Sequence, residues 1–146
     1  MTLKIRPPDN RDFPDWLPLW DGNNLGHRDE KVTSETWTRL TDPDFPVHGL
    51  VAEKNSALVG LLHYVVHPTT GNIKPVCYMQ DVYVTPDHRR EGIARKLIQH
   101  LVDQANSHKK WTRIYWLAES NNEAAQTLYK TLGSKMDFTL HMLKTD

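Results

Sequence analysis

The segment between Val76 and Ala105 constrains the fold more than any other part of this sequence. Residues 76–84 are rich in apolar and β-branched side chains, which favour a strand, and Pro86 ends that strand because proline has no N–H for a sheet. After Gly92, apolar residues recur at steps of three, four and five positions, as on a helix packed against a sheet. They are Ile93, Leu97, Ile98, Leu101, Val102 and Ala105. The segment therefore predicts a strand, a tight loop and a helix, which together form the unit of an α/β fold.

Shorter patterns predict the elements nearer the N-terminus. Leu3 and Ile5 alternate with polar neighbours, as in a strand, until Pro7 and Pro8 stop it. Two short amphipathic helices follow, and Ser34 is the expected cap of the second. Their apolar faces comprise Phe13, Trp16, Leu17, Leu19 and Trp20 in the first helix, and Trp37 and Leu40 in the second.

The remaining elements complete a sheet with helices. Residues 50–66 predict a hairpin, and Trp111–Ala118 predicts another strand. A helix follows, capped by Asn121 or Asn122 and closed by Gly133. Its inward residues would be Ala125, Leu128, Tyr129 and Leu132, and the alternating Phe138, Leu140 and Met142 predict a closing strand. We therefore expect an α/β (α+β) fold in a single domain over residues 1–146, with a mixed, mostly antiparallel sheet of six to seven strands and helices on both faces.

The composition limits the possible function classes. The 18 lysines and arginines balance 18 aspartates and glutamates, so no global charge attracts nucleic acid or an anionic membrane. The apolar runs are shorter than a membrane span, and the N-terminus lacks the pattern of a signal peptide. A single cysteine, Cys77, excludes an internal disulfide and a cysteine-based zinc site, which favours a reducing compartment. These features predict a cytoplasmic protein without nucleic-acid or membrane partners.

The loop between the expected strand and helix suits an anionic ligand. Backbone N–H groups at a helix N-terminus bind phosphate, and the helix dipole adds about half a positive charge. Small side chains at Gly92 and Ala94 let a ligand approach the backbone. Cations outnumber anions in this loop, with Arg89, Arg90, Arg95 and Lys96 against Asp87 and Glu91. The sequence therefore predicts a diphosphate site, and the alternative is an ordinary strand-to-helix turn with solvated charges.

The same loop resembles the signature of a known family. Residues 89–94, Arg-Arg-Glu-Gly-Ile-Ala, are similar to the Arg/Gln-x-x-Gly-x-Gly/Ala motif of the GCN5-related N-acetyltransferases (GNAT). The expected strand at 78–84 and the expected helix at 122–133 resemble the family elements that accompany this motif. Further positions resemble a bacterial Hpa2-like subgroup near the spermidine/spermine acetyltransferases, namely Trp37, His63, Tyr64, His67, Tyr115, Trp116 and Leu117.

The resemblance implies an acetyl-CoA site without a metal. In this family two strands splay apart, and the pantetheine arm of the coenzyme pairs with the exposed edge of one strand, here Val82, Tyr83 and Val84. The diphosphate would lie against Arg89 and on the amides of Arg90, Glu91, Gly92, Ile93, Ala94 and Arg95, while Asn122, Ala125 and Tyr129 would line the far side of the arm. Arg90 departs from the family pattern, because many members carry glycine there.

The resemblance also suggests which groups act on the acetyl group. A backbone N–H stabilises the charge that develops on the thioester oxygen, and an acid assists the leaving thiolate. By resemblance Val82 supplies the N–H and Tyr129 the acid, whereas the residues alone would make Tyr129 a core tyrosine. An acceptor amine with a pKa of about 10.4 must also lose a proton. Gln80 cannot act as a base, and the possible proton acceptors left open are Asp81, Glu119, His63 and Asp21.

Three other signals point to structure more than to chemistry. His63 and His67 have the spacing of a helical zinc pair, but in a strand they would stand about 13 Å apart. Cys77 has no base pattern beside it and is expected to be an inert buried thiol. The two helices before the hairpin would cover the acceptor, and their acidic residues either attract a cationic amine or form a solvated face. These acidic residues are Asp21, Asp29 and Glu30.

We therefore predict an acetyl-CoA-dependent N-acetyltransferase that acetylates a primary amine by direct attack in a ternary complex. The acceptor stays open among a small amine, an amino acid, a polyamine and a protein lysine. Analogy with related proteins suggests a homodimer. The rival interpretation is a non-catalytic acyl-CoA-binding sensor or interaction module. A nucleotide phosphate site is a second rival, although the loop lacks the Lys-Ser/Thr ending of a P-loop.

Overall fold

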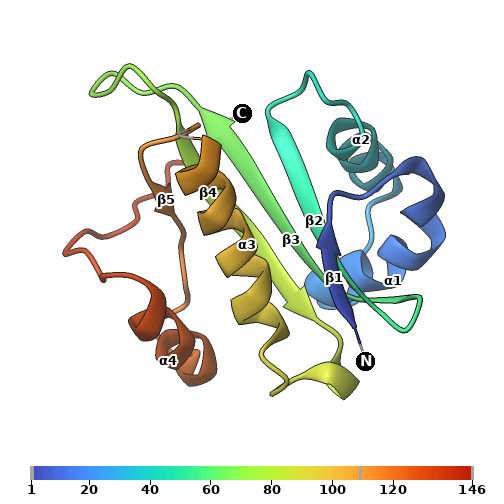
Figure 1. Ribbon diagram of the computed structural model, residues 1–146. Coiled ribbons are helices and arrows are strands. Elements are labelled where there is room, and N and C mark those ends of the chain that lie inside the picture. Colours follow the sequence, from blue (N-terminus) through green and yellow to red (C-terminus); the bar gives the residue numbers. More distant parts are fainter. Residues whose placement is uncertain (1, 109, 146) are drawn as a thin grey trace.

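The computed structural model describes residues 2–108 and 110–145. Five strands form one sheet in the order β1-β2-β3-β4-β5 (Figure 1). Their bounds are β1 Leu3–Arg6, β2 Val47–Lys54, β3 Ala57–His67, β4 Val76–Val84 and β5 Ile114–Tyr115. Neighbouring strands are antiparallel except β4 and β5, which are parallel. The mixed, mostly antiparallel sheet expected from the sequence is therefore confirmed. The expected domain over residues 1–146 includes positions 1, 109 and 146, which lie outside this description.

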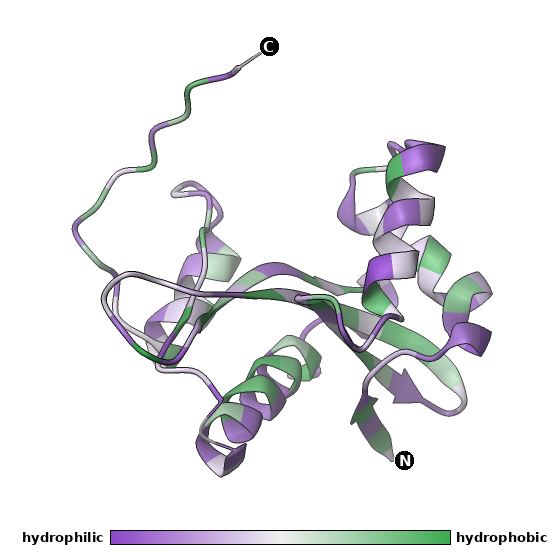
Figure 2. Cartoon of the chain, turned by 90° about the horizontal axis from the view of Figure 1, so that it is seen from above, coloured by the Kyte–Doolittle hydropathy of each residue, from purple (hydrophilic) through white to green (hydrophobic). Residues whose placement is uncertain are grey.

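Helices cover both faces of the sheet. The α-helices within the described residues are α1 Phe13–Asn23, α2 Glu30–Leu40, α3 Ile93–His108 and α4 Glu123–Leu132. Figure 2 shows α3 on one side of the sheet and the pair α1 and α2 on the other. The buried residues of α3 are four of those predicted from its apolar stripe, namely Ile93, Leu97, Ile98 and Leu101.

A tryptophan-rich core lies between the sheet and the pair α1 and α2. Trp16 and Trp20 stack with ring centres 5.2 Å apart, and both are buried against Leu61 of β3. Pro14 lies in the first turn of α1, where its missing N–H leaves no helical bond unmade. The predicted apolar face of this helix is confirmed, and it fixes α1 across β3 and β4.

The start of α2 differs from the expectation. Asp29 caps the helix, because its Oδ1 accepts the N–H groups of Lys31 at 3.0 Å and Val32 at 3.1 Å. Ser34 lies inside the helix, so the prediction that Ser34 caps it was wrong. Asp and Ser are similarly good caps, so residue preference alone does not select between Asp29 and Ser34.

The hairpin predicted over residues 50–66 forms between β2 and β3. Asn55 and Ser56 both have positive φ, 53° and 66°, which is the conformation of a two-residue hairpin turn whose twist matches the strands. β3 then pairs with β4, and the register shifts by one residue between His63 and Tyr64. This irregularity is a bulge that leaves Gln80 of β4 without a partner residue.

The sequence predicted more strand in the C-terminal part than the structure contains. Only Ile114–Tyr115 of the strand expected over 111–118 pairs with the sheet, and residues 138–143 form no strand. Phe138 is 84% exposed and Leu140 68%, because no described strand lies beside them. The described chain therefore has five strands in place of six to seven, and α4 has half-buried inward residues but no fully buried one. No helix within the described ranges is both long and apolar enough to span a bilayer.

Candidate active site

β4 and β5 separate after a short paired stretch. They pair only at Cys77 with Ile114 and at Tyr78 with Tyr115, although β4 continues to Val84. The chain after Tyr115 leaves the sheet and leads to α4. The edge of β4 that faces β5 is therefore open beyond Tyr78, which agrees with the expected splayed strand pair.

The open edge carries main-chain groups of Val82 and Val84. Thr85 N–H donates to the Val59 carbonyl of the neighbouring β3 side at 2.9 Å, so N–H groups at every second position, including Tyr83, point toward β3. The N–H groups of Val82 and Val84 alternate with these and point into the gap. Tyr83 was expected to line the arm with them, but its own main-chain groups face β3.

The loop before α3 presents a run of main-chain N–H groups. Arg90 and Gly92 have left-handed backbone conformations, with φ of 66° and 78°, and Lys96 N–H bonds the Gly92 carbonyl at 3.1 Å as the helix begins. No acceptor in the described part of the chain takes the N–H groups of residues 90–95. A Cβ placed on Gly92 would meet no heavy atom within 4 Å, so the space beside this glycine is open. Such unpaired donors at a helix N-terminus fit a diphosphate.

The first two arginines of the loop have different surroundings. Arg89 Nε donates to the Val84 carbonyl at 3.1 Å, and its guanidinium lies 5.6 Å from the centre of the Tyr83 ring. The Arg90 side chain is exposed and has no hydrogen bond or ion pair to any described residue. Arg89 therefore helps to fix the end of β4, whereas Arg90 is available to a ligand.

Two further contacts tie the loop and α3 to their neighbours. Glu91 accepts a hydrogen bond from Lys54 Nζ at 2.6 Å, and this bond holds the pKa of Glu91 below its ordinary value. Arg95 Nη2 donates to Thr131 Oγ1 at 2.7 Å and so connects α3 with α4. Glu91, one of the two acidic residues of the loop, is thus neutralised by a lysine from β2, which leaves the surplus of positive charge for an anion.

α4 brings Asn122, Ala125 and Tyr129 to the side of β5. Asn122 Oδ1 accepts the Ala125 N–H at 3.1 Å, which confirms Asn122 as the helix cap. Tyr129 is half-buried, with its ring 5.3 Å from that of Trp116, and its hydroxyl has no hydrogen-bond partner among the described residues. Burial raises the pKa of Tyr129, so the phenol keeps its proton at neutral pH and can donate it.

The structure joins two residues that the sequence left as separate possibilities. His63 Nδ1 lies 3.0 Å from Asp81 Oδ2, and the indole Nε1–H of Trp16 donates to His63 Nε2 at 3.1 Å. Asn23, the last residue of α1, donates from Nδ2 to Asp81 Oδ1 at 3.1 Å. Sequence reasoning missed Trp16 and Asn23 as members of this series of hydrogen bonds, because only the packing of α1 on β3 and β4 brings them there.

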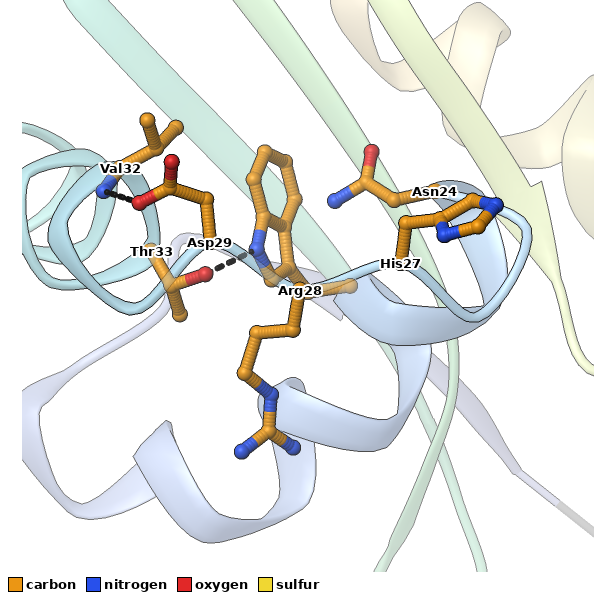
Figure 3. A pocket seen from close by; sticks show the side chains of 7 residues that line it. Asn24, His27, Arg28, Asp29, Val32 and Thr33 are labelled. Atoms are coloured by element: carbon orange, nitrogen blue, oxygen red, sulfur yellow. Dashed lines mark hydrogen bonds between the residues drawn. The ribbon is translucent and has the colours of Figure 1, made fainter.

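The acidic residues between α1 and α2 are engaged in local contacts. Arg28 bonds to both Asp21 and Glu30, and Trp20 Nε1 donates to Thr33 Oγ1 at 2.9 Å. A pocket of ≈ 400 Å³ opens beside these contacts (Figure 3). It is lined by Trp20, Asn24, His27, Arg28, Asp29, Val32 and Thr33. The carboxylates here stabilise the α1–α2 junction in preference to forming a free acidic face.

The remaining signals have structural explanations. His67 Nε2 lies 2.7 Å from the Tyr115 hydroxyl, so His63 and His67 have separate partners. Over the residues that the structure describes, no group of three or more His, Cys, Asp or Glu side chains could hold a metal ion. Cys77 is fully buried, and burial raises the pKa of its thiol to about 12, which agrees with the inert thiol expected from the sequence.

Comparison with known proteins gives the same family. The acetyltransferase (GNAT) family matches residues 12–133. The D-amino-acid N-acetyltransferase HPA3 of Saccharomyces cerevisiae is 29% identical over 144 residues, which cover 95% of this chain and 89% of the yeast protein. The L-amino acid N-acyltransferase MnaT of Escherichia coli is 32% identical over 89 residues, covering 61% of this chain and 49% of MnaT.

Solved structures share the fold. A ribosomal-protein-alanine N-acetyltransferase from Brucella melitensis biovar Abortus 2308 superimposes with a TM-score of 0.82 at 22% identity, covering 99% of this chain and 100% of that one. AAC(6')-Iy in complex with a CoA-linked bisubstrate analogue has a TM-score of 0.84 at 17% identity, over 100% of this chain and 99% of that one. With a family match over most of its length, this chain belongs to the acetyltransferase (GNAT) family and is an acetyl-CoA-dependent N-acetyltransferase.

Proposed function

We propose that the protein moves the acetyl group of acetyl-CoA to a primary amine by direct attack in a ternary complex. The observation that carries this proposal is the combination of unpaired N–H groups at residues 90–95 with the open edge of β4. The first suits the diphosphate of the coenzyme, and the second suits its peptide-like pantetheine arm. The two features lie at the same end of β4, since the loop follows directly from that strand.

The proposed coenzyme contacts are mostly main-chain contacts. Val82 and Val84 bond the arm through their N–H and C=O groups, and Tyr83 lies between them. The amides of Arg90, Glu91, Gly92, Ile93, Ala94 and Arg95 hold the diphosphate, and the Arg89 and Arg90 guanidinium groups add positive charge. Asn122, Ala125 and Tyr129 line the other side. Because main-chain donors do most of the binding, substitution of side chains in the loop has less effect than a change of its backbone shape.

The proposed chemistry rests on two groups. The Val82 N–H points into the gap and donates to the thioester oxygen as negative charge develops there. The Tyr129 hydroxyl gives its proton to the leaving thiolate, and its raised pKa keeps it protonated until that step. The acceptor amine attacks the thioester directly, so no acetyl group is transferred to the protein.

The identity of the acceptor is the open part of the proposal. HPA3 is named for D-amino acids and MnaT for L-amino acids, and this chain is similar to both. Amino acids are therefore the first acceptors to test, followed by small amines, polyamines and a lysine-containing peptide. We also propose that the chain falls in the Hpa2-like subgroup. The residues that support this are Trp37, His63, Tyr64, His67, Tyr115, Trp116 and Leu117.

The test is release of CoA thiol with this panel of amines, for the wild type and for Tyr129→Phe. We expect amine-dependent release by the wild type, and a kcat at least about 100-fold lower in the variant, because general acid catalysis is worth about 10²–10⁴. The dissociation constant of acetyl-CoA, measured by calorimetry, should change less than about twofold.

Tyr64→Phe is the matched control. Tyr64 is also shielded from solvent, with 8% of its surface exposed, but it lies near Trp111 at the other end of the sheet. Its variant should keep the wild-type kcat. Acetyl-CoA binding without amine-dependent thiol release would favour the rival function, a non-catalytic acyl-CoA sensor. Absence of any affinity for the coenzyme would contradict both.

We further propose a cytoplasmic homodimer. The C-terminal segment supports the dimer, because five large apolar side chains are exposed there, namely Met136, Phe138, Leu140, Met142 and Leu143. A second subunit would remove them from water. The single cysteine, a buried free thiol, is compatible with the reducing cytoplasm.

A further inference from the structure

The contact with Trp16 fixes the tautomer of His63. An indole N–H can only donate, so His63 Nε2 must be the acceptor of the 3.1 Å bond. The neutral ring then carries its hydrogen on Nδ1 and donates it to Asp81. If Nε2 also carried a hydrogen, two N–H groups would face each other inside the core, where His63 is 4% exposed. His63 is therefore built as a donor to Asp81 and is poorly placed to take a proton from an amine.

The Asp81 carboxylate is ionised, partly exposed and not paired with a cation among the described residues. Burial raises the pKa of Asp81, but the contact with His63, followed by the hydrogen bond from Asn23, outweighs burial and brings the pKa below its ordinary value, so Asp81 is ionised at neutral pH. In the described part of the chain, no lysine or arginine nitrogen lies within 4.0 Å of this carboxylate. The two donors leave about half of the lone-pair sites of a carboxylate free. The side chain is 22% exposed, so a ligand can reach it.

The position of Asp81 relates it to the open edge of β4. Asp81 directly precedes Val82, whose N–H points into the gap, and successive residues of a strand are about 3.3 Å apart. The Val82 side chain packs on the α3 side, whereas Asp81 bonds to Asn23 of α1 on the opposite side. A group bound to Asp81 therefore approaches Val82 from the α1 side of the sheet.

We infer that Asp81 binds the ammonium group of the acceptor, and that His63, oriented by Trp16, is the positioning residue that holds this carboxylate. The inference rests on the proposed function and specifies its acceptor as a cation at this point. Asp81 is assigned to binding and not to proton removal, because a carboxylate that favours its ionised form is a weak base. The rival explanation is that the hydrogen-bond chain only anchors α1 to the sheet.

The first test compares steady-state constants of the wild type and Asp81→Asn with lysine amide and spermidine as acceptors. Asn keeps the shape and removes the charge. We expect KM for the amine to rise at least tenfold, while KM for acetyl-CoA stays within twofold. Asp103→Asn, which changes an exposed carboxylate of α3, is the control and should leave both constants unchanged. An unchanged amine KM in Asp81→Asn would overturn the inference.

A second pair of variants tests the role of His63. In His63→Asn the side-chain amide can still donate from near the position of Nδ1, whereas His63→Leu has no donor. The inference expects a raised amine KM in His63→Leu and substantial recovery in His63→Asn. If the hydrogen bonds of His63 only anchor α1 to the sheet, both variants should lose stability, and their KM values for the amine should not differ.

A measurement on the wild type covers the case in which the variants do not fold. Nitrogen-15 NMR of the His63 ring should show hydrogen on Nδ1 alone, and lysine amide added to the complex with CoA should shift that resonance with saturation. A resonance that does not move at saturating lysine amide would count against the inference. Because this readout needs no turnover, an absence of thiol release from the wild type would contradict the proposed function separately.

Discussion

Arg90 and Gly92 shape the loop through left-handed backbone conformations, and only one of them is glycine. A residue with a Cβ pays about 1–2 kcal/mol for that conformation, whereas glycine adopts it freely. Arg90, with φ of 66°, therefore carries local strain. The unpaired N–H groups that follow depend on this shape of the loop.

Arg90→Gly should stabilise the protein by up to about 1 kcal/mol, since relief of the strain exceeds the extra entropy of glycine in the unfolded chain. Arg90→Ala removes the same charge but keeps the Cβ, so we expect no gain. Urea denaturation of the two variants checks this difference, and equal midpoints would refute it. Both variants should lose the same small part of the affinity for acetyl-CoA, measured by calorimetry.

Because of Asp12, the free energy of unfolding should fall as the solution becomes acidic. Arg6 donates to both oxygens of Asp12, at 2.7 and 2.9 Å, and these bonds hold the pKa of Asp12 below its ordinary value. The unfolded chain, with an Asp pKa of about 3.9, then binds the proton first, so this stabilisation is present above that pH and is lost as the pH falls through the lower folded value.

Asp12→Asn should lower the free energy of unfolding at pH 7 by about 1–3 kcal/mol and flatten its decline below pH 4. Chemical denaturation between pH 2 and pH 7 measures both effects. Asp44→Asn, at an exposed position, is the control. Parallel pH curves for Asp12→Asn and the wild type would show that the Arg6–Asp12 pair is not responsible.

At the scale of elements, α3 and α4 differ in how firmly they are held. α3 buries four side chains against the sheet, whereas no side chain of α4 is fully buried. The contacts of α4 are partly buried apolar residues and the Arg95–Thr131 hydrogen bond. The helix that carries Asn122 and Tyr129 is therefore the less stable of the two.

Hydrogen exchange should detect this difference. We expect the amides of α4 to exchange at least about tenfold faster than those of α3, because local opening of α4 exposes little apolar surface. CoA should slow exchange in α4 and in the loop before α3, while α2 serves as an internal control without change. Equal effects of CoA on α2 and α4 would indicate a global response and not binding beside α4.

At the scale of the whole molecule, the C-terminal segment is the part without a place in the core. Figure 2 shows it extending away from the sheet, and its apolar side chains alternate at positions 136, 138, 140 and 142. Such alternation favours a strand, but a strand needs a partner edge. Within the described chain no strand lies beside it, which is why the expected closing strand does not form.

Removal of residues 134–146 should convert the proposed dimer to a monomer with little loss of thermal stability. The two buried clusters lie before this segment, so the core is unchanged. Sedimentation velocity gives the oligomeric state, and calorimetry gives the melting temperature. A full-length monomer at micromolar concentration would contradict the dimer, and a large fall in melting temperature would mean that the segment packs on its own subunit.

The sequence determined the elements that depend on local pattern. The strand, loop and helix over residues 76–105 could be predicted from the apolar and β-branched side chains of 76–84, from Pro86 and from the apolar repeat after Gly92. The hairpin could be predicted from residues 50–66. The positions of the loop and of the Asn122 cap could be predicted in the same way. The length of β5 could not, because the number of pairs depends on the path of the chain after Tyr115.

Only the tertiary structure decided which face of β4 each side chain uses. Strict alternation would place Met79 and Asp81 on the same face, but the bulge opposite His63 and Tyr64 separates them. Met79 enters the core under α3, while Asp81 meets His63, which is 18 positions away in sequence. The position of a bulge depends on pairing with another strand, so the sequence of the bulged strand carries no periodic signal for it. The sequence could therefore identify His63 and Asp81 as candidates, but it could not predict that they lie in contact.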